Sequence, residues 1–183
     1  MILTGPAIEQ AVADGEIVLD PFDAAQVNPN SYNYRLGPVL RIFRDQVADP
    51  RREAATTEVQ LPEDGYVLEP GRVHLGTTAE RIGSTRFVPS LIGRSSLGRL
   101  GCFLQVSADL GQLGAVHHWT LEIVAVQPLR IYPGMRIGQV SFWAPTGAML
   151  PYTGHYGTLD SPSPWHPGAV RGAGALLAEG VGV

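Results

Sequence analysis

The sequence predicts an all-β protein, a sandwich, jelly roll or barrel of short strands, with one short helix near the N-terminus. Glycines (22) and prolines (15) recur too often among the 183 residues to allow long helices. The short apolar segments between them are typical of strands. With 44% hydrophobic residues, the chain can bury one sizeable core. We therefore predict a single domain over residues 1–165 and a flexible C-terminal tail over 166–183.

The predicted elements follow in order along the chain. A helix is expected where Thr4-Gly5-Pro6 precedes apolar residues at helical spacing and Gly15 provides a stop. A charged excursion that carries no core is expected over residues 45–58. Strands are expected at residues 66–68, 73–75, 87–92, 120–126 and 139–143.

Composition excludes several functional classes. The formal net charge of -4 and the pI near 5.7 provide no basic face for nucleic acid. No apolar stretch reaches the roughly 18 residues of a membrane span, and the N-terminus lacks a basic region followed by an apolar core, so a cytoplasmic protein is expected. Cys102 is the only cysteine and can form neither an internal disulfide nor a paired-thiolate zinc site. All 13 basic residues are arginine, which excludes Schiff-base chemistry and a Walker-type lysine.

A polar motif follows the apolar run at residues 87–92 and reads G-R-S-S-L-G-R-L-G, from Gly93 to Gly101. It can be a strand-to-helix turn whose serines cap the helix and whose arginines face solvent. It can also be an anion cradle, in which Arg94 and Ser96 face phosphate. Ser95 and Arg99 are four residues apart, so one helical turn would place them on the same side as candidates for chemistry.

Two further features lie in the expected strand near residue 120. Glu122 is the lone acid in W-T-L-E-I and is either an outward-facing surface residue or a general base. His117 and His118 are adjacent, so on a strand they point to opposite faces and at most one can face a given site. This spacing disfavours metal ligation by the pair.

The polar motif resembles G-R-S-S-x-x-R-x-G, the signature of the dCTP deaminases in the dUTPase-like superfamily. Residues 30–37 are similar to the S-x-D-x-R-L-G strand of that family, with Asn33 in place of the acid. Residues 66–71 resemble its next strand and turn, and residues 132–139 its P-G-M-x-I-G turn. The resemblance covers roughly residues 1–165. It implies a dUTPase-like distorted jelly roll or β-barrel and a homotrimer with a site at each subunit interface.

The resemblance also implies zinc-independent hydrolytic deamination of a cytosine nucleotide, by default dCTP to dUTP plus ammonia. Glu122 would be the general base, Ser95 would hold the water or the tetrahedral centre, and Arg99 would order both. Nucleobase deaminases that use zinc need H-x-E and P-C-x-x-C elements, which this sequence lacks. No zinc is therefore expected, and Mg²⁺ could enter with the nucleotide phosphates.

Departures from the family pattern fall at the sugar and phosphate contacts. Gln112 stands where the family has an acid that, in dUTPases and bifunctional deaminases, helps to activate the water attacking phosphorus. Its presence argues against triphosphate hydrolysis, and Asp109 could replace it only if the register slips by three residues. In G-H-Y-G-T-L, similar to the G-K-Y-x-x-Q segment that closes over the triphosphate, His155 replaces lysine and Leu159 replaces glutamine, whereas Tyr156 is kept.

Three classes of function remain open. The first is a deaminase of dCTP, or of a different or modified cytidine nucleotide of the CMP or dCMP type. The second is a dUTPase-like pyrophosphatase. The third is a noncatalytic homologue that binds nucleotide, although the joint presence of Ser95, Arg99 and Glu122 argues against a pure binder.

Overall fold

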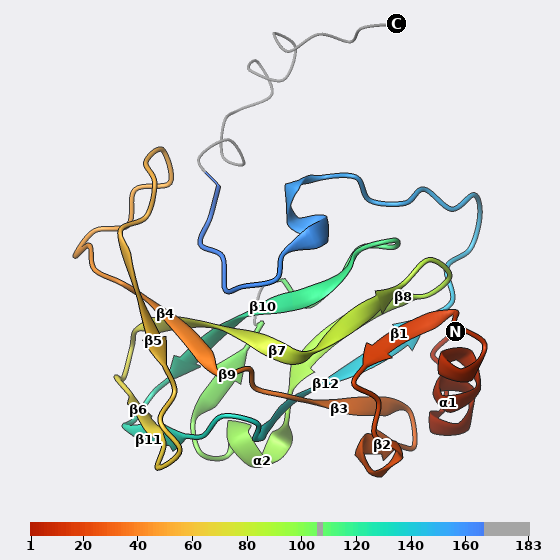
Figure 1. Ribbon diagram of the computed structural model, residues 1–183, viewed down its shortest axis with the longest axis horizontal. Coiled ribbons are helices and arrows are strands. Elements are labelled where there is room, and N and C mark those ends of the chain that lie inside the picture. The colour runs from red at the N-terminus through yellow and green to blue at the C-terminus, as the bar shows by residue number, and fades with distance from the viewer. Residues whose placement is uncertain (106–107, 167–183) are drawn as a thin grey trace, which may run out of the picture.

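The computed structural model describes residues 1–105 and 108–166, and its strands form three sheets (Figure 1). The largest sheet has the order β5 (Thr56–Gln60), β4 (Val39–Phe43), β7 (Val73–Ser84), β10 (Val116–Ala125) and β9 (Cys102–Leu104), with β1 (Ile17–Asp20) also paired to β7. A four-stranded sheet has the order β2 (Val27–Asn28), β3 (Ser31–Arg35), β12 (Arg136–Trp143) and β8 (Val88–Gly93). The third sheet pairs β6 (Tyr66–Leu68) with β11 (Leu129–Ile131). Four short helical elements complete the described fold: α1 (Gly5–Ala13), η1 (Ala24–Gln26), α2 (Ser95–Gly98) and η2 (His155–Thr158).

One hydrophobic cluster joins the two large sheets. It includes Tyr32 and Tyr34 from β3, Phe142 from β12, and Leu121 and Ile123 from β10, all fully buried. Alternate residues of a strand point to opposite faces. The burial of Leu121 and Ile123 therefore turns the residue between them to the outer face of the large sheet.

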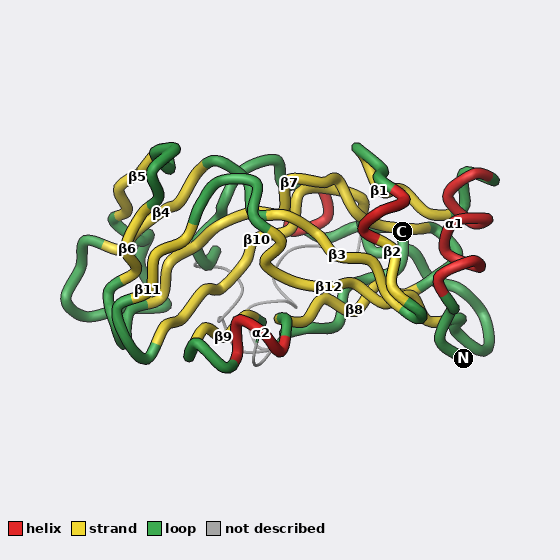
Figure 2. The backbone as a smooth tube through the Cα atoms, turned by 90° about the horizontal axis from the view of Figure 1, so that it is seen from below, coloured by secondary structure: helices red, strands yellow, loops and turns green. Residues whose placement is uncertain are grey.

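The elements are spread along the long axis of the molecule. Figures 1 and 2 show α1 at one end and the β6–β11 pair at the other, with the long strands β7 and β10 between them. Strands β7 and β10 pair from Val73 and Val124 to Gly83 and Val116, with a bulge between His118 and Thr120. The longest pairing in the sheet thus runs along the strand that carries the candidate base.

The structure confirms the predicted all-β class with one short N-terminal helix. Helix α1 begins beside Pro6, and Gly15 adopts a φ of +72° just beyond its end. Thr4 occupies the N-cap position, but its side chain makes no capping hydrogen bond. No helix in the described ranges is long and apolar enough to cross a membrane.

Several element boundaries required correction, among them the start of β12, which lies at Arg136 rather than at residue 139. Strand β7 continues to Ser84 and β10 begins at Val116, so both extend beyond the predicted segments. The predicted excursion over residues 45–58 is mostly exposed, but its last three residues begin β5, which pairs with β4. The predicted tail lies outside the described residues, except for His166.

Candidate active site

The polar motif forms the turn between β8 and the one-turn helix α2. Arg94 has an extended backbone (φ −109°, ψ 140°), and its carbonyl accepts hydrogen bonds from the amides of Leu97 (3.0 Å) and Gly98 (2.9 Å). Leu97 is 8% exposed and anchors the turn in the core. Gly101, the last residue of the motif, takes a φ of +77°, a conformation that favours glycine.

Tyr34 fixes the end of β8 where the motif begins. Its hydroxyl donates to the carbonyl of Ile92 (3.1 Å), and burial raises its pKa, so it stays a phenol that can donate. The ring crosses Gly138, where a Cβ would lie 2.0 Å from the Tyr34 oxygen. Gly138 in turn pairs with Gly93. The motif therefore starts from a strand end that tolerates no side chain at position 138.

The polar side chains of the motif have no partners within the described chain. Ser95, Ser96 and Arg99 are exposed, whereas Arg94 is half-buried. None of the four side chains forms a hydrogen bond or ion pair with another described residue, and Arg94 Nε is buried without an acceptor. Buried donors are nearly always satisfied. The motif is thus a strand-to-helix turn whose unused donors suit an anionic ligand.

Glu122 lies in the middle of β10 on the outer face of the large sheet. Its neighbours Leu121 and Ile123 are 0% exposed, while Glu122 itself is half-buried and pairs with Leu75 of β7. Its carboxylate has no partner among the described residues. Its amide donates to Oε1 of Gln105 (2.8 Å). The orientation is that of an outward-facing acid, and an unpaired, partly desolvated carboxylate is also suited to act as a base.

Strand β9 connects the motif to the Glu122 strand. A Cβ at Gly93 would lie 3.9 Å from the backbone nitrogen of Leu104, and Leu104 pairs with Ile123. Neighbouring strands lie about 4.8 Å apart. Within one chain, β9 therefore lies between the start of the motif and the strand that carries Glu122. No hydrogen bond or ion pair among the described residues joins the Glu122 carboxylate to the side chains of α2.

Gln112 lies on the connection that leads from β9 back to β10. It is exposed, and only its backbone carbonyl is engaged, by the amide of Ala115 (3.2 Å). The connection runs along β8, where the Asp109 carbonyl accepts from the amide of Leu91 (2.7 Å). The Asp109 carboxylate accepts from Ser90 Oγ at 3.3 Å. Position 112 thus presents a neutral amide to solvent, and Asp109, the nearest acid along the chain, is hydrogen-bonded to β8.

The C-terminal segment, residues 152–166, folds back over the outer face of β10. The Ser163 amide donates to Oγ1 of Thr120 (3.1 Å), two residues from Glu122. Trp165 stacks on Phe43 of β4 with ring centroids 5.3 Å apart. The segment therefore crosses the same sheet face that carries the Glu122 carboxylate.

His155 and Tyr156 lie on η2 within this segment. The His155 ring is 5.2 Å from the Tyr156 ring and 4.8 Å from the His166 ring. The Tyr156 hydroxyl accepts from the His166 amide (2.9 Å). Figure 1 shows η2, the blue helical turn at the top, and α2, at the bottom, on opposite sides of the molecule. One chain therefore does not bring His155 and Tyr156 together with Arg94 and Ser96.

His117 and His118 are engaged in hydrogen bonds with backbone carbonyls. Because a carbonyl can only accept, Nδ1 of His117 donates to the carbonyl of His118 (2.9 Å), and Nδ1 of His118 donates to that of Thr78 (3.1 Å). The His117 ring packs on Trp119 with centroids 4.3 Å apart, and burial lowers the pKa of His117.

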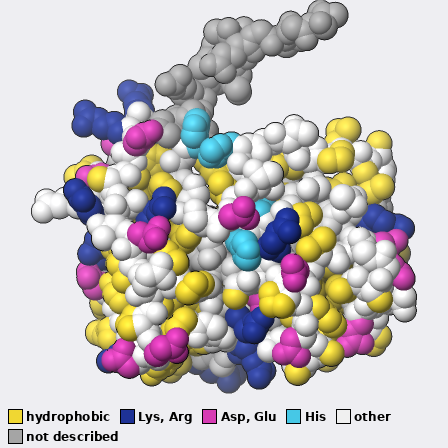
Figure 3. Space-filling view, viewed as in Figure 1, with side chains coloured by type: hydrophobic (Ala, Val, Ile, Leu, Met, Phe, Trp, Pro, Cys, Tyr) yellow, Lys and Arg dark blue, Asp and Glu magenta, His cyan; other side chains and the backbone are white. Residues whose placement is uncertain are grey.

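No group of three His, Cys, Asp or Glu side chains within residues 1–105 and 108–166 is arranged to hold a metal ion. On the face seen in Figure 3, acidic and basic side chains are interspersed.

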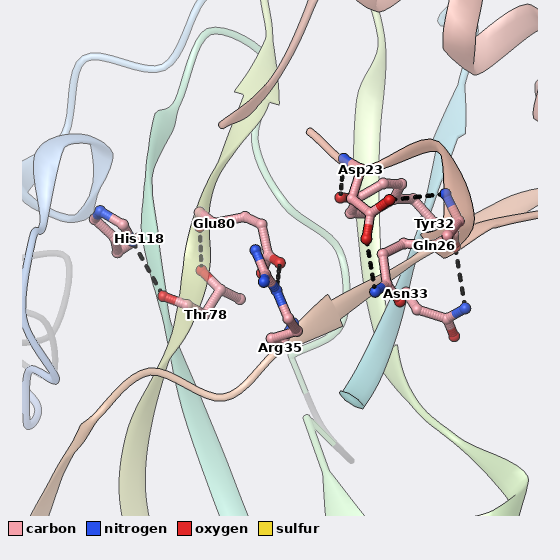
Figure 4. Close-up of polar contacts among 9 residues, drawn as sticks. Asp23, Gln26, Tyr32, Asn33, Arg35, Thr78, Glu80 and His118 are labelled. Carbon is pink, nitrogen blue, oxygen red and sulfur yellow. Dashed lines mark hydrogen bonds and ion pairs between the residues drawn. The ribbon is translucent and has the colours of Figure 1, made fainter. Parts of the chain in front are cut away.

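Sequence reasoning missed a buried ion pair between the two large sheets (Figure 4). Glu80 of β7 is 0% exposed and accepts from both Nε (2.6 Å) and the backbone amide (2.9 Å) of Arg35 on β3. The side-chain hydrogen bond to Glu80 raises the pKa of Arg35. The only available signal was an acid within an apolar and threonine-rich strand.

The structure also explains the departure at Asn33. Its side chain is 3% exposed, and Nδ2 donates to the carbonyl of Gln26 (3.0 Å), as Figure 4 shows. The same nitrogen donates to Oδ1 of Asn28 (3.1 Å). A carboxylate cannot donate these two hydrogen bonds. Nδ2 of Asn33 is therefore matched to its local acceptors, whereas Oδ1 is buried without a hydrogen-bond partner among the described residues.

The sequence is similar to a known protein family and to named relatives. Residues 2–144 match a protein family described as dCTP deaminase-like. A relative from Hathewaya histolytica named "dCTP deaminase, dUMP-forming" is 42% identical over 153 residues, which cover 84% of this chain and 88% of the relative. A Rhodopirellula baltica protein named "dCTP deaminase" is 42% identical over 147 residues, covering 80% of this chain and 74% of that protein.

A solved structure supports the same relationship. The crystal structure of 2'-deoxycytidine 5'-triphosphate deaminase from Agrobacterium tumefaciens superposes with a TM-score of 0.61 at 26% identity. The match covers 77% of this chain and 47% of that one. Both the fold and the sequence thus agree with the resemblance carried by the polar motif, and the chain belongs to the dCTP deaminase-like family.

Proposed function

We propose that the protein is an enzyme that hydrolytically deaminates a cytosine nucleotide, with dCTP as the default substrate. The observation that carries this proposal is the set of unpartnered side chains on adjacent elements: Ser95 and Arg99 on the α2 turn and Glu122 on β10. Glu122 is half-buried without a partner, which costs free energy unless a ligand engages its carboxylate, whereas Ser95 and Arg99 are exposed donors that a ligand can reach. The family relationship and the names of the relatives support this chemistry.

In the proposed mechanism, Glu122 takes a proton from a water molecule as its oxygen attacks C4 of cytosine. Glu122 passes this proton to N3 of the ring. It then carries the hydroxyl proton of the tetrahedral centre to the amino group, so that the C4–N bond breaks, ammonia leaves and uracil remains. Ser95 holds the water or the tetrahedral centre, and Arg99 orders Ser95 and Glu122 through fixed donors. The mechanism needs no zinc at the reacting carbon, and Mg²⁺ would enter only with the nucleotide phosphates.

We assign the phosphate contacts to Arg94 and Ser96 from the polar motif, with His155 and Tyr156 contributed by another copy. This division follows from the separation of α2 and η2 within one chain. Exposed apolar side chains surround the motif and offer a surface for a second copy: Ile92, Leu100, Phe103 and Val126. We therefore propose a cytoplasmic homotrimer with intersubunit sites. Light scattering should give about three times the 19.6 kDa chain mass.

The phosphate count of the product is a separate question. The exposed amide of Gln112 cannot take a proton from water, which favours dUTP as the product. Several relatives are nevertheless named "dUMP-forming". Formation of dUMP is therefore the second candidate, and Asp109 is the nearest carboxylate on the same connection that could assist it.

A substrate panel tests the proposal. Purified protein is incubated separately with CTP, dCTP, CMP, dCMP, dUTP and modified cytidine nucleotides, while ammonia, pyrophosphate and the pyrimidine spectrum are followed. Ammonia release from dCTP without pyrophosphate indicates a dUTP-forming deaminase, and release of both indicates a dUMP-forming one. Pyrophosphate from dUTP without any ammonia would identify a pyrophosphatase instead. Binding without turnover of any nucleotide would identify a noncatalytic homologue.

A further inference from the structure

The ladder between β9 and β10 ends one residue before Glu122. Leu104 pairs with Ile123, Phe103 with Val124, and the next pair along the ladder would join Gln105 to Glu122. At that point the chain leaves the strand, because Gln105 adopts a φ of +49°. Gln105 is the only residue other than glycine with positive φ in the described part of the chain. The main chain therefore cannot continue the ladder to Glu122.

The side chain of Gln105 continues the ladder instead. Its Oε1 accepts the hydrogen bond from the Glu122 amide at 2.8 Å. Its Nε2 lies 3.4 Å from the carbonyl of Ala108, so the same amide group also reaches the connection that follows. Gln105 is 7% exposed, and its amide oxygen takes the place that a strand carbonyl would otherwise fill.

This arrangement fixes the backbone at the candidate base rather than touching the reacting atoms. The Glu122 carboxylate has no partner in the described chain, so its position depends on the backbone from which it projects. Misplacement of a catalytic group by about 1 Å can lower turnover about 100-fold. A left-handed conformation at a residue other than glycine is also unfavourable and is kept only where the surroundings require it.

We propose that Gln105 is a positioning residue for Glu122: its side-chain carbonyl holds the Glu122 backbone in the geometry that deamination requires. This inference rests on the proposed function.

Three variants distinguish the loss of the Gln105 side-chain acceptor from effects of backbone strain and of lower stability. Gln105→Met keeps the side-chain length and removes the acceptor. Gln105→Gly accepts positive φ without strain and also removes the acceptor. Gln26→Met is the matched control, because Gln26 is equally buried at 7% and bonds Asp23 instead.

Hydrogen–deuterium exchange with residue resolution tests the hydrogen bond without relying on activity. The Glu122 amide should exchange at least about tenfold faster in Gln105→Met and Gln105→Gly than in the wild type, while Ile123 stays protected. Gln26→Met should leave both amides unchanged. Unchanged exchange at Glu122 in Gln105→Met would overturn the inferred hydrogen bond.

Steady-state kinetics tests the positioning role. Both Gln105 variants should lower kcat for dCTP about 10- to 100-fold and leave KM within about twofold, because the binding groups of α2 are untouched. Gln26→Met should retain kcat at a similar melting temperature. Wild-type kcat in Gln105→Met, or full activity in Gln105→Gly alone, would overturn the positioning role. A wild-type protein that deaminates no nucleotide would refute the proposed function, while the exchange result would still decide the hydrogen bond.

Discussion

Removing the Arg35 side chain should destabilise the protein more than removing the charge of its partner Glu80. In Arg35→Met, the carboxylate of Glu80 remains at 0% exposure and keeps only the Arg35 backbone amide as a donor. Breaking a buried ion pair typically costs about 3–5 kcal/mol. The Arg35 side chain is 31% exposed and one donor remains, so we expect the low end, about 3 kcal/mol. In a domain of this size, that lowers the melting temperature by about 6–12 °C.

Chemical unfolding at a fixed protein concentration measures this difference directly. Glu80→Gln keeps an acceptor for the backbone amide and leaves Arg35 partly in water, so it should cost only about 1–2 kcal/mol. Arg35→Met/Glu80→Gln should be more stable than Arg35→Met alone, because the buried charge is gone. Arg52→Met, at a pair whose arginine is 83% exposed, should cost less than about 1 kcal/mol. An Arg35→Met variant as stable as Arg52→Met would refute the reasoning.

Three further predictions concern the site and the pH dependence of stability. Glu122→Gln should retain dCTP binding by calorimetry while deamination falls at least about 100-fold, and near wild-type turnover would remove Glu122 from the mechanism. Arg94→Ala should weaken binding of dCTP more than that of deoxycytidine, because it removes a charge-assisted phosphate contact; equal losses would make Arg94 structural. Burial lowers the pKa of His74, so the unfolded chain binds this proton more readily, and the free energy of unfolding should fall as the pH drops below about 6.5 towards the folded-state pKa. His74→Leu should flatten this slope between pH 8 and pH 5.5, and an unchanged slope would assign the pH dependence to other groups.

Some features of the fold follow from short stretches of sequence. Pro6 and Gly15 mark the two ends of α1 because a fixed φ favours a helix start and positive φ favours a helix stop. The G-R-S-S turn follows a buried strand as predicted, and Leu97 is its only buried residue. Alternation along β10 likewise determines that Glu122 points away from Leu121 and Ile123. Each of these features depends on residues within a few positions of one another.

Other features depend on residues that lie far apart in the sequence. Strand β7 continues through glycine, threonine and alanine to Ser84 because β1, β4 and β10 all pair with it. Residues 56–58 become the start of β5 because β4 supplies their partners. Propensity alone indicates neither outcome, since cross-strand contacts decide strand stability.

The sequence by itself determined the all-β class, the N-terminal helix, the polar turn and the candidate residues Ser95, Arg99 and Glu122. The first three depend on local composition and spacing. The candidate residues depend on the four-residue spacing of Ser95 and Arg99, on a lone acid in an apolar strand, and on the resemblance of the motif to the family signature. Only the tertiary structure decided that Glu80 pairs with Arg35 across 45 positions, and that Gln105 bonds the amide of Glu122 across 17. A buried charge or a ladder end must find a partner wherever the fold brings one near, and no local pattern specifies which residue that is.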